Sequence, residues 1–501
     1  MLFLLGLFIA AAVIEQFTVR SSTLKGLRSV LVGVAIAAVF LSGSYLFLSR
    51  WTVWGSIWLI SLYRIVNLIR FGSSRLPEAE LKRLAPRTSI WLILAELVIV
   101  AFSYLFVNVH WSRHYIGLFI ALIQLLIAAY LLKSIFHTWK HTNIPPIINP
   151  RSDHDLPSLS VLIPARNETV DLEECLLSLV ASDYPKLEII VLDDCSVTKR
   201  TPEIIRMFAH DGVRFIQGEM PDEKNWLAKN QAYERLSSEA SGGVLLFCGV
   251  DARFERQTLR LLVETMLERK KQMVSVLPLR ADQAQSSITF IQPMRYLWEL
   301  ALPRKLFNRP PVLSTCWIIS ADSLKRLGGF KAVARKIVPE AYFANQLTAH
   351  DGYSFVRSNN LLGLASSKAL DEQQATAIRT RYPQLHRRIE LVVFTALTEL
   401  FVFVMPLAQC FVAWLLPFPV YIFIASLTAS LFLLTIYYFV AVRTKLNSPL
   451  LAWICFPLAI FTDVVLLHVS MIKYEFSSVE WKGRNVCIPV MRVEPHLPRI
   501  K

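Results

Sequence analysis

Long apolar runs lie at both ends of the chain and flank a central stretch of mixed polar and apolar sequence. A helix that crosses the hydrocarbon core of a bilayer needs about 20 mostly apolar residues, because each residue adds only ~1.5 Å of length. Segments of this kind before residue 140 span roughly 2–18, 28–48, 52–69, 88–108 and 115–136. The pattern therefore predicts an N-terminal transmembrane region of about five helices over residues 1–148.

The loops between these predicted helices alternate in charge. Basic residues follow the first, third and fifth segments: Arg20, Lys25 and Arg28; Arg70, Arg75, Lys82, Arg83 and Arg87; and Lys133 and Lys140. Loops rich in lysine and arginine face the cytosol. We therefore expect a multi-pass protein of the plasma membrane in which the sequence after residue 140 begins in the cytosol.

Residues 149–388 alternate short β-rich runs with amphipathic helical patterns. The strand candidates are 158–165, 187–194, 213–218 and 243–249, and helical patterns at 169–181 and 201–210 lie between them. This order is typical of βαβ units on a mainly parallel sheet flanked by helices. The sequence therefore predicts a cytosolic α/β domain inserted between two transmembrane helix bundles.

Apolar sequence returns over residues 389–475, and the number of crossings there is open. Three full spans would put the tail, residues 476–501, outside; two, or two plus an interfacial segment, would leave it beside the central domain. Asp463 lies in the last apolar segment, and a charge in mid-bilayer costs about 2.5–3.5 kcal/mol on insertion scales. We therefore expect a cytosolic tail.

The composition limits the kinds of binding partner that we expect. The chain is 54% hydrophobic and 18% charged, with a formal net charge of +15. A basic excess can indicate nucleic-acid binding, but cytoplasmic loops that face anionic lipid carry the same excess, and here the charge follows the loops. We expect a lipid bilayer and no nucleic acid. The seven cysteines have no CxxC spacing, which argues against a disulfide framework or a structural zinc site.

Acidic residues follow three predicted strands: Glu168 after the first, Asp193 and Asp194 at the end of the second, and Asp251 after the fourth. The carboxyl ends of parallel strands meet at one edge, where doubly wound sheets bind nucleotides. Carboxylates there can accept hydrogen bonds from a base or ribose, and their oxygens suit Mg²⁺ or Mn²⁺. A helix cap is the alternative role for Asp194 and Asp251. Lys229, at the start of a predicted helix, could hold a pyrophosphate or be merely solvated.

Taken in order, these segments resemble the family-2 glycosyltransferases of GT-A fold. IPARNE, VLDDCS, NWLAKNQA and LGGF are similar to the family's P-A-x-N-E, D-D-x-S, W-x-G-K-x-x-A and G-G-F motifs. The tail sequence WKGR resembles the membrane branch that glycosylates carotenoids, hopanoids and ceramide-type lipids. The resemblance covers about residues 155–390 and the tail, and implies a nucleotide-sugar-binding domain.

The resemblance also implies a role for individual residues. The nucleoside would lie against Pro164, Ala165, Arg166, Glu168, Asp193 and Asp194; Lys229 would lie near the diphosphate; Asp251 would bind the metal; Glu340 would be the catalytic base; and Gln384, Arg387, Arg388, Trp481 and Arg484 would face the diphosphate or the acceptor. The implied cofactor is Mg²⁺ or Mn²⁺, and the implied donor is a UDP-sugar. Trp481 and Arg484 are equally suited to anchoring the tail at the membrane interface.

Four positions depart from the family's motifs. Gly249 replaces the first acid of the metal-binding pair, Pro339-Glu340 replaces an E-D pair, Ala228 replaces a glycine, and Arg388 stands where a tryptophan is usual. These departures leave open a catalytically degenerate glycosyltransferase that acts as a scaffold or sensor.

The expected function is transfer of a sugar from a nucleotide-sugar to a lipid or polyprenyl-linked acceptor, with inversion, giving a glycolipid. Glu340 would deprotonate an acceptor hydroxyl, whereas an acceptor phosphate is already anionic and would not need a base. The alternative enzyme is a processive polysaccharide synthase, against which Arg388 counts because such enzymes keep an intact Q-x-x-R-W motif.

Overall fold

The computed structural model describes residues 10–16, 60–69, 84, 86–98, 112–147, 149–222, 225–281, 296–297, 300, 310–368, 370–415, 419–444 and 449–487. Most of the predicted membrane segments 2–18, 28–48, 52–69 and 88–108 lies outside these residues, as do the basic residues of the first predicted loop. All the candidate site residues lie within them.

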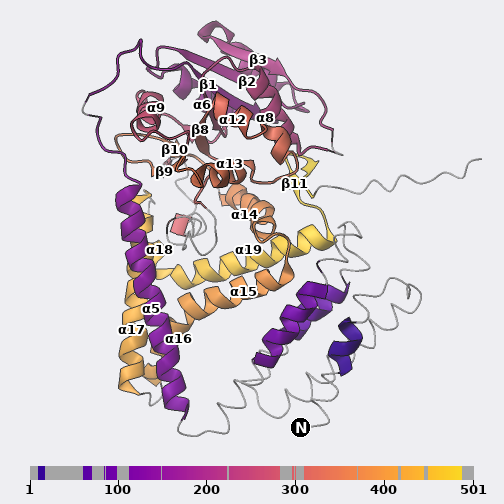
Figure 1. Cartoon of the computed structure of the whole chain (residues 1–501), viewed down its shortest axis with the longest axis vertical. Helices are drawn as coiled ribbons and strands as arrows, with labels where there is room; N and C mark the ends of the chain where they lie inside the picture. Colours follow the sequence, from indigo (N-terminus) through magenta and orange to yellow (C-terminus); the bar gives the residue numbers. More distant parts are fainter. Residues whose placement is uncertain are drawn as a thin grey trace, which may run out of the picture.

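A seven-stranded sheet forms the centre of the soluble domain, in the order β3-β2-β1-β4-β8-β6-β9 (Figure 1). Its strands are β1 Leu159–Ala165, β2 Leu187–Asp193, β3 Val213–Gln217, β4 Val244–Cys248, β6 Met273–Leu277, β8 Cys316–Ser320 and β9 Tyr353–Arg357. Strands β1 to β4 pair in parallel, and β8 runs antiparallel to both of its neighbours. The predicted α/β fold with a mainly parallel sheet is confirmed, and the four predicted strands agree closely with β1 to β4.

Helices cover both faces of this sheet, which explains why its strands are almost continuously apolar. Val161 and Ile163 of β1 belong to a core on one face, and Leu162 belongs to a core on the other. The helices of the domain are α6 Val170–Val180, α7 Arg200–Met207, η1 Ala209–Asp211, α8 Ala228–Glu239, α9 Thr258–Glu268, α12 Ala321–Arg326, η2 Phe330–Val333 and α13 Pro339–Thr348. Ala165 is in register with Asp193, so the ends of β1 and β2 meet at one edge.

Two small sheets lie beside the large one. Strands β5 Ala252–Arg253, β7 Leu279–Arg280 and β10 Ala365–Ser366 form the first, in the order β5-β10-β7. Strands β11 Glu480–Trp481 and β12 Arg484–Asn485 form the second, an antiparallel hairpin. Lys482 and Gly483 form its two-residue turn, and both have positive φ, +50° and +76°. Such turns match the twist of the flanking strands.

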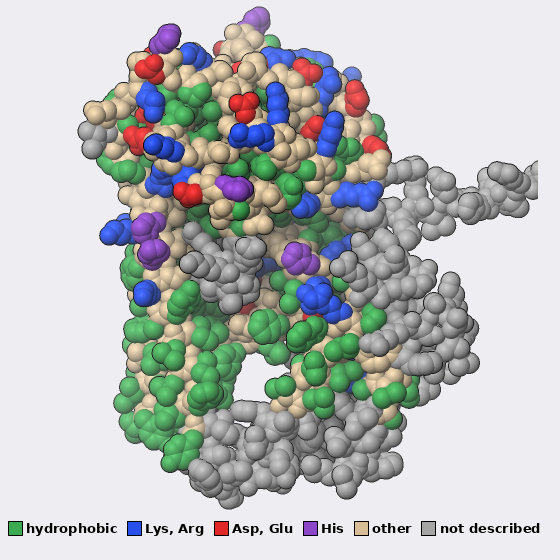
Figure 2. Space-filling view, viewed as in Figure 1, with side chains coloured by type: hydrophobic (Ala, Val, Ile, Leu, Met, Phe, Trp, Pro, Cys, Tyr) green, Lys and Arg blue, Asp and Glu red, His purple; other side chains and the backbone are tan. Residues whose placement is uncertain are grey.

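Apolar helices extend away from the soluble domain. They are α5 Ser112–His141, α15 Ile389–Glu399, the π-helical turn η3 Leu400–Val404, α16 Met405–Leu415, α17 Val420–Arg443, α18 Pro449–Ile454 and α19 Phe456–Phe476. Within the described residues, four stretches are long and apolar enough to cross a bilayer: Gly117–His141, Ile389–Leu415, Val420–Arg443 and Phe456–Phe476. Helices α5 and α17 pack side by side (Figure 1). Apolar side chains cover this part, whereas charged side chains gather on the domain (Figure 2).

Helix α14, Leu370–Gln384, lies between the domain and the apolar helices and packs on α19 (Figure 1). The backbone N–H of Tyr382 donates to Ser470 Oγ at 3.1 Å, and its hydroxyl donates to Glu475 Oε1 at 2.8 Å. Arg381 forms an ion pair with Asp463. Asp463, whose charge makes a bilayer crossing by the last apolar segment unfavourable, is therefore paired with a cation from α14.

Candidate functional site

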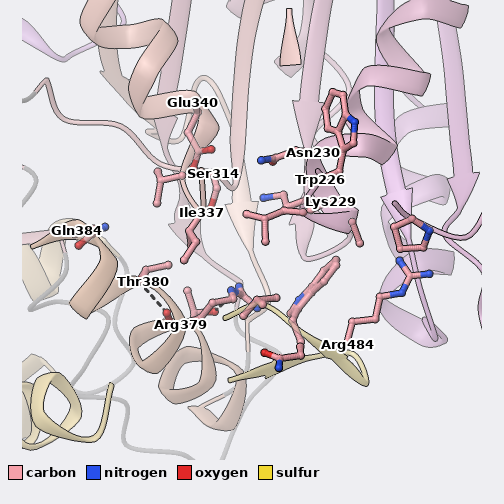
Figure 3. A pocket seen from close by; sticks show the side chains of 18 of the residues that line it. Trp226, Lys229, Asn230, Ser314, Ile337, Glu340, Arg379, Thr380, Gln384 and Arg484 are labelled. Carbon is pink, nitrogen blue, oxygen red and sulfur yellow. Dashed lines mark hydrogen bonds between the residues drawn. The ribbon is translucent and has the colours of Figure 1, made fainter. Parts of the chain in front are cut away.

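A cavity opens where three parts of the molecule meet: the soluble domain, α14 and the β11–β12 hairpin (Figure 3). It encloses about 920 Å³, counting the part open to solvent. Its lining consists of Pro221, Trp226, Leu227, Ala228, Lys229, Asn230, Val312, Ser314, Ile337, Val338, Glu340, Thr376, Arg379, Thr380, Gln384, Trp481, Arg484, Asn485 and Val486. Five predicted site residues are among them: Lys229, Glu340, Gln384, Trp481 and Arg484.

The N-terminal turn of α8 brings Lys229 and Asn230 to the cavity. The helix begins at Ala228, directly after the extended residue Leu227. The side chains of its first turn therefore lie at the cavity. Lys229 Nζ lies 5.2 Å from the centre of the Tyr233 ring. Backbone N–H groups at a helix N-terminus and a lysine ammonium together attract anions. This corner of the cavity therefore suits a phosphate group.

Glu340 lies in the first turn of α13, where Pro339 starts the helix with its fixed φ. It is 2% exposed and lines the cavity. Burial, and next the charge of Glu340 with a smaller effect of Asp251, raises the pKa of the Tyr233 phenol. Two carboxylates that are distant in sequence thus both lie near one buried phenol of α8.

The strand-end acids gather at the rim of the sheet but hold partners there. Asp193 Oδ1 accepts hydrogen bonds from the Ser196 hydroxyl at 2.5 Å and from the Ser196 N–H at 3.2 Å. Asp194 Oδ2 accepts from Arg484 Nη1 at 2.5 Å, and Glu168 Oε2 accepts from Lys482 Nζ at 3.0 Å. Burial raises the pKa of Glu168, and the neighbouring Lys482 opposes that rise.

Arg166 joins the same rim to the hairpin. Its Nε donates to the Lys482 carbonyl at 2.9 Å, and its Nη1 donates to the Asp194 carbonyl at 2.7 Å. Burial, followed by the nearby Arg484, lowers the pKa of Arg166. Pro164 and Ala165 end β1 directly before it. The residues predicted to hold a nucleoside are therefore adjacent in space, and the hairpin lies across them.

Asp251, which follows β4, has a hydrogen-bonded carboxylate. Its Oδ2 accepts from Ser366 Oγ at 2.7 Å, and it lies outside the cavity lining. The described residues contain no group of three His, Cys, Asp or Glu side chains placed to hold a metal. One carboxylate is enough for a Mg²⁺ that takes its other ligands from phosphates and water. The residues present therefore fit a cation carried largely by a diphosphate.

The Q-x-x-R-like segment divides between two environments. Gln384 lines the cavity, whereas Arg387 lies against α19, 3.7 Å from Glu475 and 3.1 Å from the Tyr474 carbonyl. Arg388 Nε donates to Glu390 Oε1 at 2.6 Å, at the start of α15. The structure therefore does not bring Arg387 and Arg388 to the cavity with the other predicted residues.

Arg379 is a cavity residue that the motif comparison did not identify. It lies on the face of α14 that also carries Thr376 and Thr380, and its guanidinium is 5.6 Å from the centre of the Trp481 ring. The three-to-four-residue spacing of this face was the available signal. With Lys229 and Arg484, Arg379 gives the lining three cations against the single carboxylate of Glu340. The cavity is therefore built for an anion.

Comparison with known proteins agrees with this geometry. Residues 160–328 match the model of the family described as Glycosyl transferase family 2. The "Probable glycosyltransferase YdaM" of Bacillus subtilis is 29% identical over 191 residues, which cover 36% of this chain and 45% of the relative. The "Glycosyltransferase AglE" of Haloferax volcanii is 32% identical over 117 residues, which cover 22% of this chain and 36% of the relative. The chain thus spans less than half the length of these two curated relatives.

Among solved structures, the mannosyltransferase PcManGT from Pyrobaculum calidifontis, in complex with GDP-Man and Mn²⁺, aligns with a TM-score of 0.42 at 16% identity. That alignment covers 71% of this chain and 98% of the other. A likeness this low carries no argument about the site, so the assignment stands on the family match and the strand-end motifs within it. Residues 160–328 of this chain are therefore similar to the proteins of glycosyl transferase family 2.

Proposed function

We propose that this protein transfers a sugar from a nucleotide-sugar to a lipid or lipid-linked acceptor at the cytosolic face of a membrane, with inversion at the anomeric carbon. One observation carries the proposal. The cavity that contains Glu340, Lys229, Arg379 and Arg484 lies between the family-2 domain and α14, and α14 in turn packs on the apolar helix α19.

Two sets of residues bind the donor: one set binds the nucleoside, and the other binds the diphosphate. The rim formed by Arg166, Asp193 and Asp194 offers hydrogen-bond partners for a base and ribose, here assigned to uridine. Lys229, Arg379 and Arg484 face the same cavity and neutralise a diphosphate. Asp251 would hold a divalent cation, which supplies further neutralisation of the leaving group.

The chemistry needs one base and one stabilised leaving group. Glu340 takes the proton of an acceptor hydroxyl, and the acceptor oxygen attacks the anomeric carbon from the face opposite the diphosphate. The bond between that carbon and the diphosphate oxygen breaks, and both electrons leave with the nucleoside diphosphate. The cavity's cations stabilise the negative charge that develops there. The products are a glycosylated acceptor, a nucleoside diphosphate and a protonated Glu340.

The position of α14 supports a lipid acceptor. Thr376, Arg379 and Thr380 line the cavity, while Arg381 and Tyr382 bind residues of α19. An acceptor anchored in the bilayer needs to raise only its headgroup past this helix to reach Glu340. A soluble acceptor would not require a site so close to the apolar helices.

The test uses the full chain in detergent with radiolabelled nucleotide-sugars, Mg²⁺ or Mn²⁺ and a membrane lipid extract. We expect one donor to give a labelled lipid, and we expect Glu340→Gln to lower its rate by about 10²–10⁴-fold, as for loss of a general base. Glu203→Gln, an exposed acid on α7, is the matched control and should keep the rate.

Other results identify the alternatives. A near-normal rate for Glu340→Gln with a labelled polyprenyl phosphate as product would show a phosphate acceptor, and Glu340 would not be the base. Tight nucleotide-sugar binding with no labelled lipid for any donor would contradict transfer and support a degenerate scaffold or sensor. A labelled product that grows into a polymer would identify a processive synthase.

A further inference from the structure

Helices α5 and α17 both end where the apolar helices meet the soluble domain (Figure 1). The backbone N–H of Arg357 in β9 donates to the carbonyl of Thr142, directly after α5, at 2.9 Å. The backbone N–H of Arg280 in β7 donates to the carbonyl of Thr444, directly after α17, at 3.1 Å. The two helices also pack against each other. With these apolar helices in a bilayer, their ends lie at the level of the phospholipid headgroups.

Two guanidinium groups lie beside two aromatic rings at this level. The Trp139 ring of α5 and the Phe439 ring of α17 pack edge to face, with their centres 5.0 Å apart. The Arg357 guanidinium lies 4.0 Å from the centre of the Trp139 ring, and the Arg443 guanidinium lies 5.4 Å from the centre of the Phe439 ring. An aromatic ring attracts a cation to its face, so the contact between the rings brings the two cations together.

Neither guanidinium group forms an ion pair with a carboxylate of the residues that the structure describes. The Arg357 side chain donates to two uncharged oxygens, the Trp139 carbonyl at 3.3 Å and Asn143 Oδ1 at 2.8 Å. Arg443 is exposed. Burial, followed by the charge of Arg443, lowers the pKa of Arg357 to about 10. The two like charges therefore repel each other, and an anion bound between them would offset this repulsion.

The end of α5 adds a third cation to this surface. Lys140 is exposed and follows Phe136 by four residues, which places the two on one face of the helix. The Phe136 ring lies 5.3 Å from the Phe439 ring, so this face of α5 is directed toward α17. Neither α5 nor α17 contains an aspartate or a glutamate. Basic side chains are visible at the junction between the domain and the apolar part (Figure 2).

We propose that Arg357, Arg443 and Lys140 bind the phosphate group of an anionic phospholipid of the surrounding bilayer. Guanidinium groups match the oxygens of a phosphate and form paired hydrogen bonds with them. The acyl chains of the lipid would lie against exposed apolar side chains of the two helices, such as Phe136 and Tyr438. This site is separate from the proposed sugar transfer, because none of the three cations lines the cavity.

A lipid bound here joins three parts of the chain. Arg357 belongs to β9 of the soluble domain, Lys140 to α5 and Arg443 to α17. One phosphate that contacts all three cations therefore holds the domain against both helices. The lipid should raise the thermal stability of the full chain as well as bind to it.

The test measures binding of radiolabelled phosphatidylglycerol to the full chain in an uncharged detergent. The competitors are unlabelled phosphatidylglycerol, phosphatidylcholine with the same acyl chains, and inorganic phosphate. We expect phosphatidylglycerol to displace the label at about tenfold lower concentration than phosphatidylcholine, because each cation near the lipid surface favours a negatively charged headgroup. Inorganic phosphate lacks the acyl chains, and we expect it not to displace the label at the concentrations at which the lipid does.

Arg443→Gln is the main variant, because Arg443 is exposed and its removal should leave the fold intact. We expect it to weaken phosphatidylglycerol binding about tenfold, through loss of a charged hydrogen-bond donor to the phosphate. Arg206→Gln is the matched control. Arg206 is also an exposed arginine beside an aromatic ring, 5.3 Å from the centre of the Phe215 ring, but it lies on α7. It should leave lipid binding unchanged.

The other outcomes overturn the proposal. Equal displacement by phosphatidylglycerol and phosphatidylcholine would mean that no site selects an anionic lipid. Displacement by inorganic phosphate at the same concentrations would show a site for free phosphate rather than for a lipid. An equal loss of binding in Arg206→Gln and Arg443→Gln would mean that the lipid responds only to the net charge of the chain.

Discussion

At the scale of single residues, Gly249 shows how a departure from a motif can have a local cause. A Cβ at this position would lie 2.4 Å from Asp251 Oδ1, which is closer than non-bonded atoms approach. Any side chain at position 249 would thus force the Asp251 carboxylate to move from its bond with Ser366. The sequence shows that the first acid of the motif is replaced by Gly249. The structure shows that the carboxylate of the second acid, Asp251, occupies the space beside that glycine.

Asn230 is a positioning residue that acts on Glu340 through the preceding loop. Its Nδ2 donates to the carbonyls of Val333, Ala334 and Lys336 at 2.8, 3.1 and 2.8 Å. These bonds hold the segment that leads into α13 and therefore into Glu340. The side chain is almost fully buried, so no water can easily replace its bonds.

We predict that Asn230→Leu lowers kcat about tenfold or more and leaves the donor KM nearly unchanged, because Lys229 keeps its place while the Glu340 loop loosens. The orphaned carbonyls should also lower the free energy of unfolding by about 1–3 kcal/mol. Initial-rate kinetics and thermal unfolding check both expectations. Ser238→Ala, an exposed change on α8, is the control. An increase in donor KM with no change in kcat would contradict a role in positioning the base.

At the scale of elements, the two faces of α14 have different roles: one faces the proposed donor site, and the other packs against the apolar helices. One face carries Arg379 to the cavity, and the other carries Arg381 and Tyr382 to α19. Arg387, just beyond its end, faces the fully buried Glu475. Both arginines belong to one short basic stretch, and only the direction in which each points decides its role.

We predict opposite effects for the two arginines. Arg379→Ala should raise the donor KM about tenfold, because it removes a cation from the cavity, and should change thermal stability little. Arg387→Ala should leave the donor KM unchanged and lower the free energy of unfolding by about 1–3 kcal/mol, because it weakens the partners of a buried carboxylate. Kinetics and thermal unfolding of both variants provide the measurement. If instead Arg387→Ala raised the donor KM and Arg379→Ala lowered the stability, Arg387 would belong to the donor site and Arg379 would not.

At the scale of the whole molecule, the hairpin determines how the chain can cross a membrane. The region from α15 to α19 begins at the soluble domain and ends in a hairpin that contacts the same domain through Lys482 and Arg484. We therefore predict that both ends lie on one side of the bilayer, which makes the number of crossings between them even. The described part of this region contains three apolar stretches of sufficient length, so at least one of them is predicted not to cross.

Helix α19 is the stretch most suited to lying along the membrane surface. It runs crosswise to α5 and α17, directly below the domain (Figure 1), and it carries Asp463 and Glu475, which bind residues of α14. The test uses two epitopes, one placed after residue 487 and one inserted at the exposed turn around Asp153. We predict that antibody binds both epitopes in inverted membrane vesicles and neither epitope in right-side-out vesicles. Detection of the two on opposite sides would contradict the even number of crossings.

The sequence alone determined the features that depend on local periodicity and on strand geometry. Apolar runs of bilayer length predicted α5 and the C-terminal helices, and alternation around Val161 and Leu162 reflects a strand buried on both faces. The motif order indicated that Glu168, Asp194 and Asp251 follow strands of one sheet, because parallel strands bring their carboxyl ends to one edge.

Only the tertiary structure decided which cations face the cavity and which carboxylates are already occupied. The rotation of α14 about its axis places Arg379 inward, and the chain beyond it turns Arg387 and Arg388 toward α19 and α15. The docking of Lys482 and Arg484 on Glu168 and Asp194 joins positions some three hundred residues apart. Such contacts depend on long-range packing and charge pairing, which neither periodicity nor motif spacing contains.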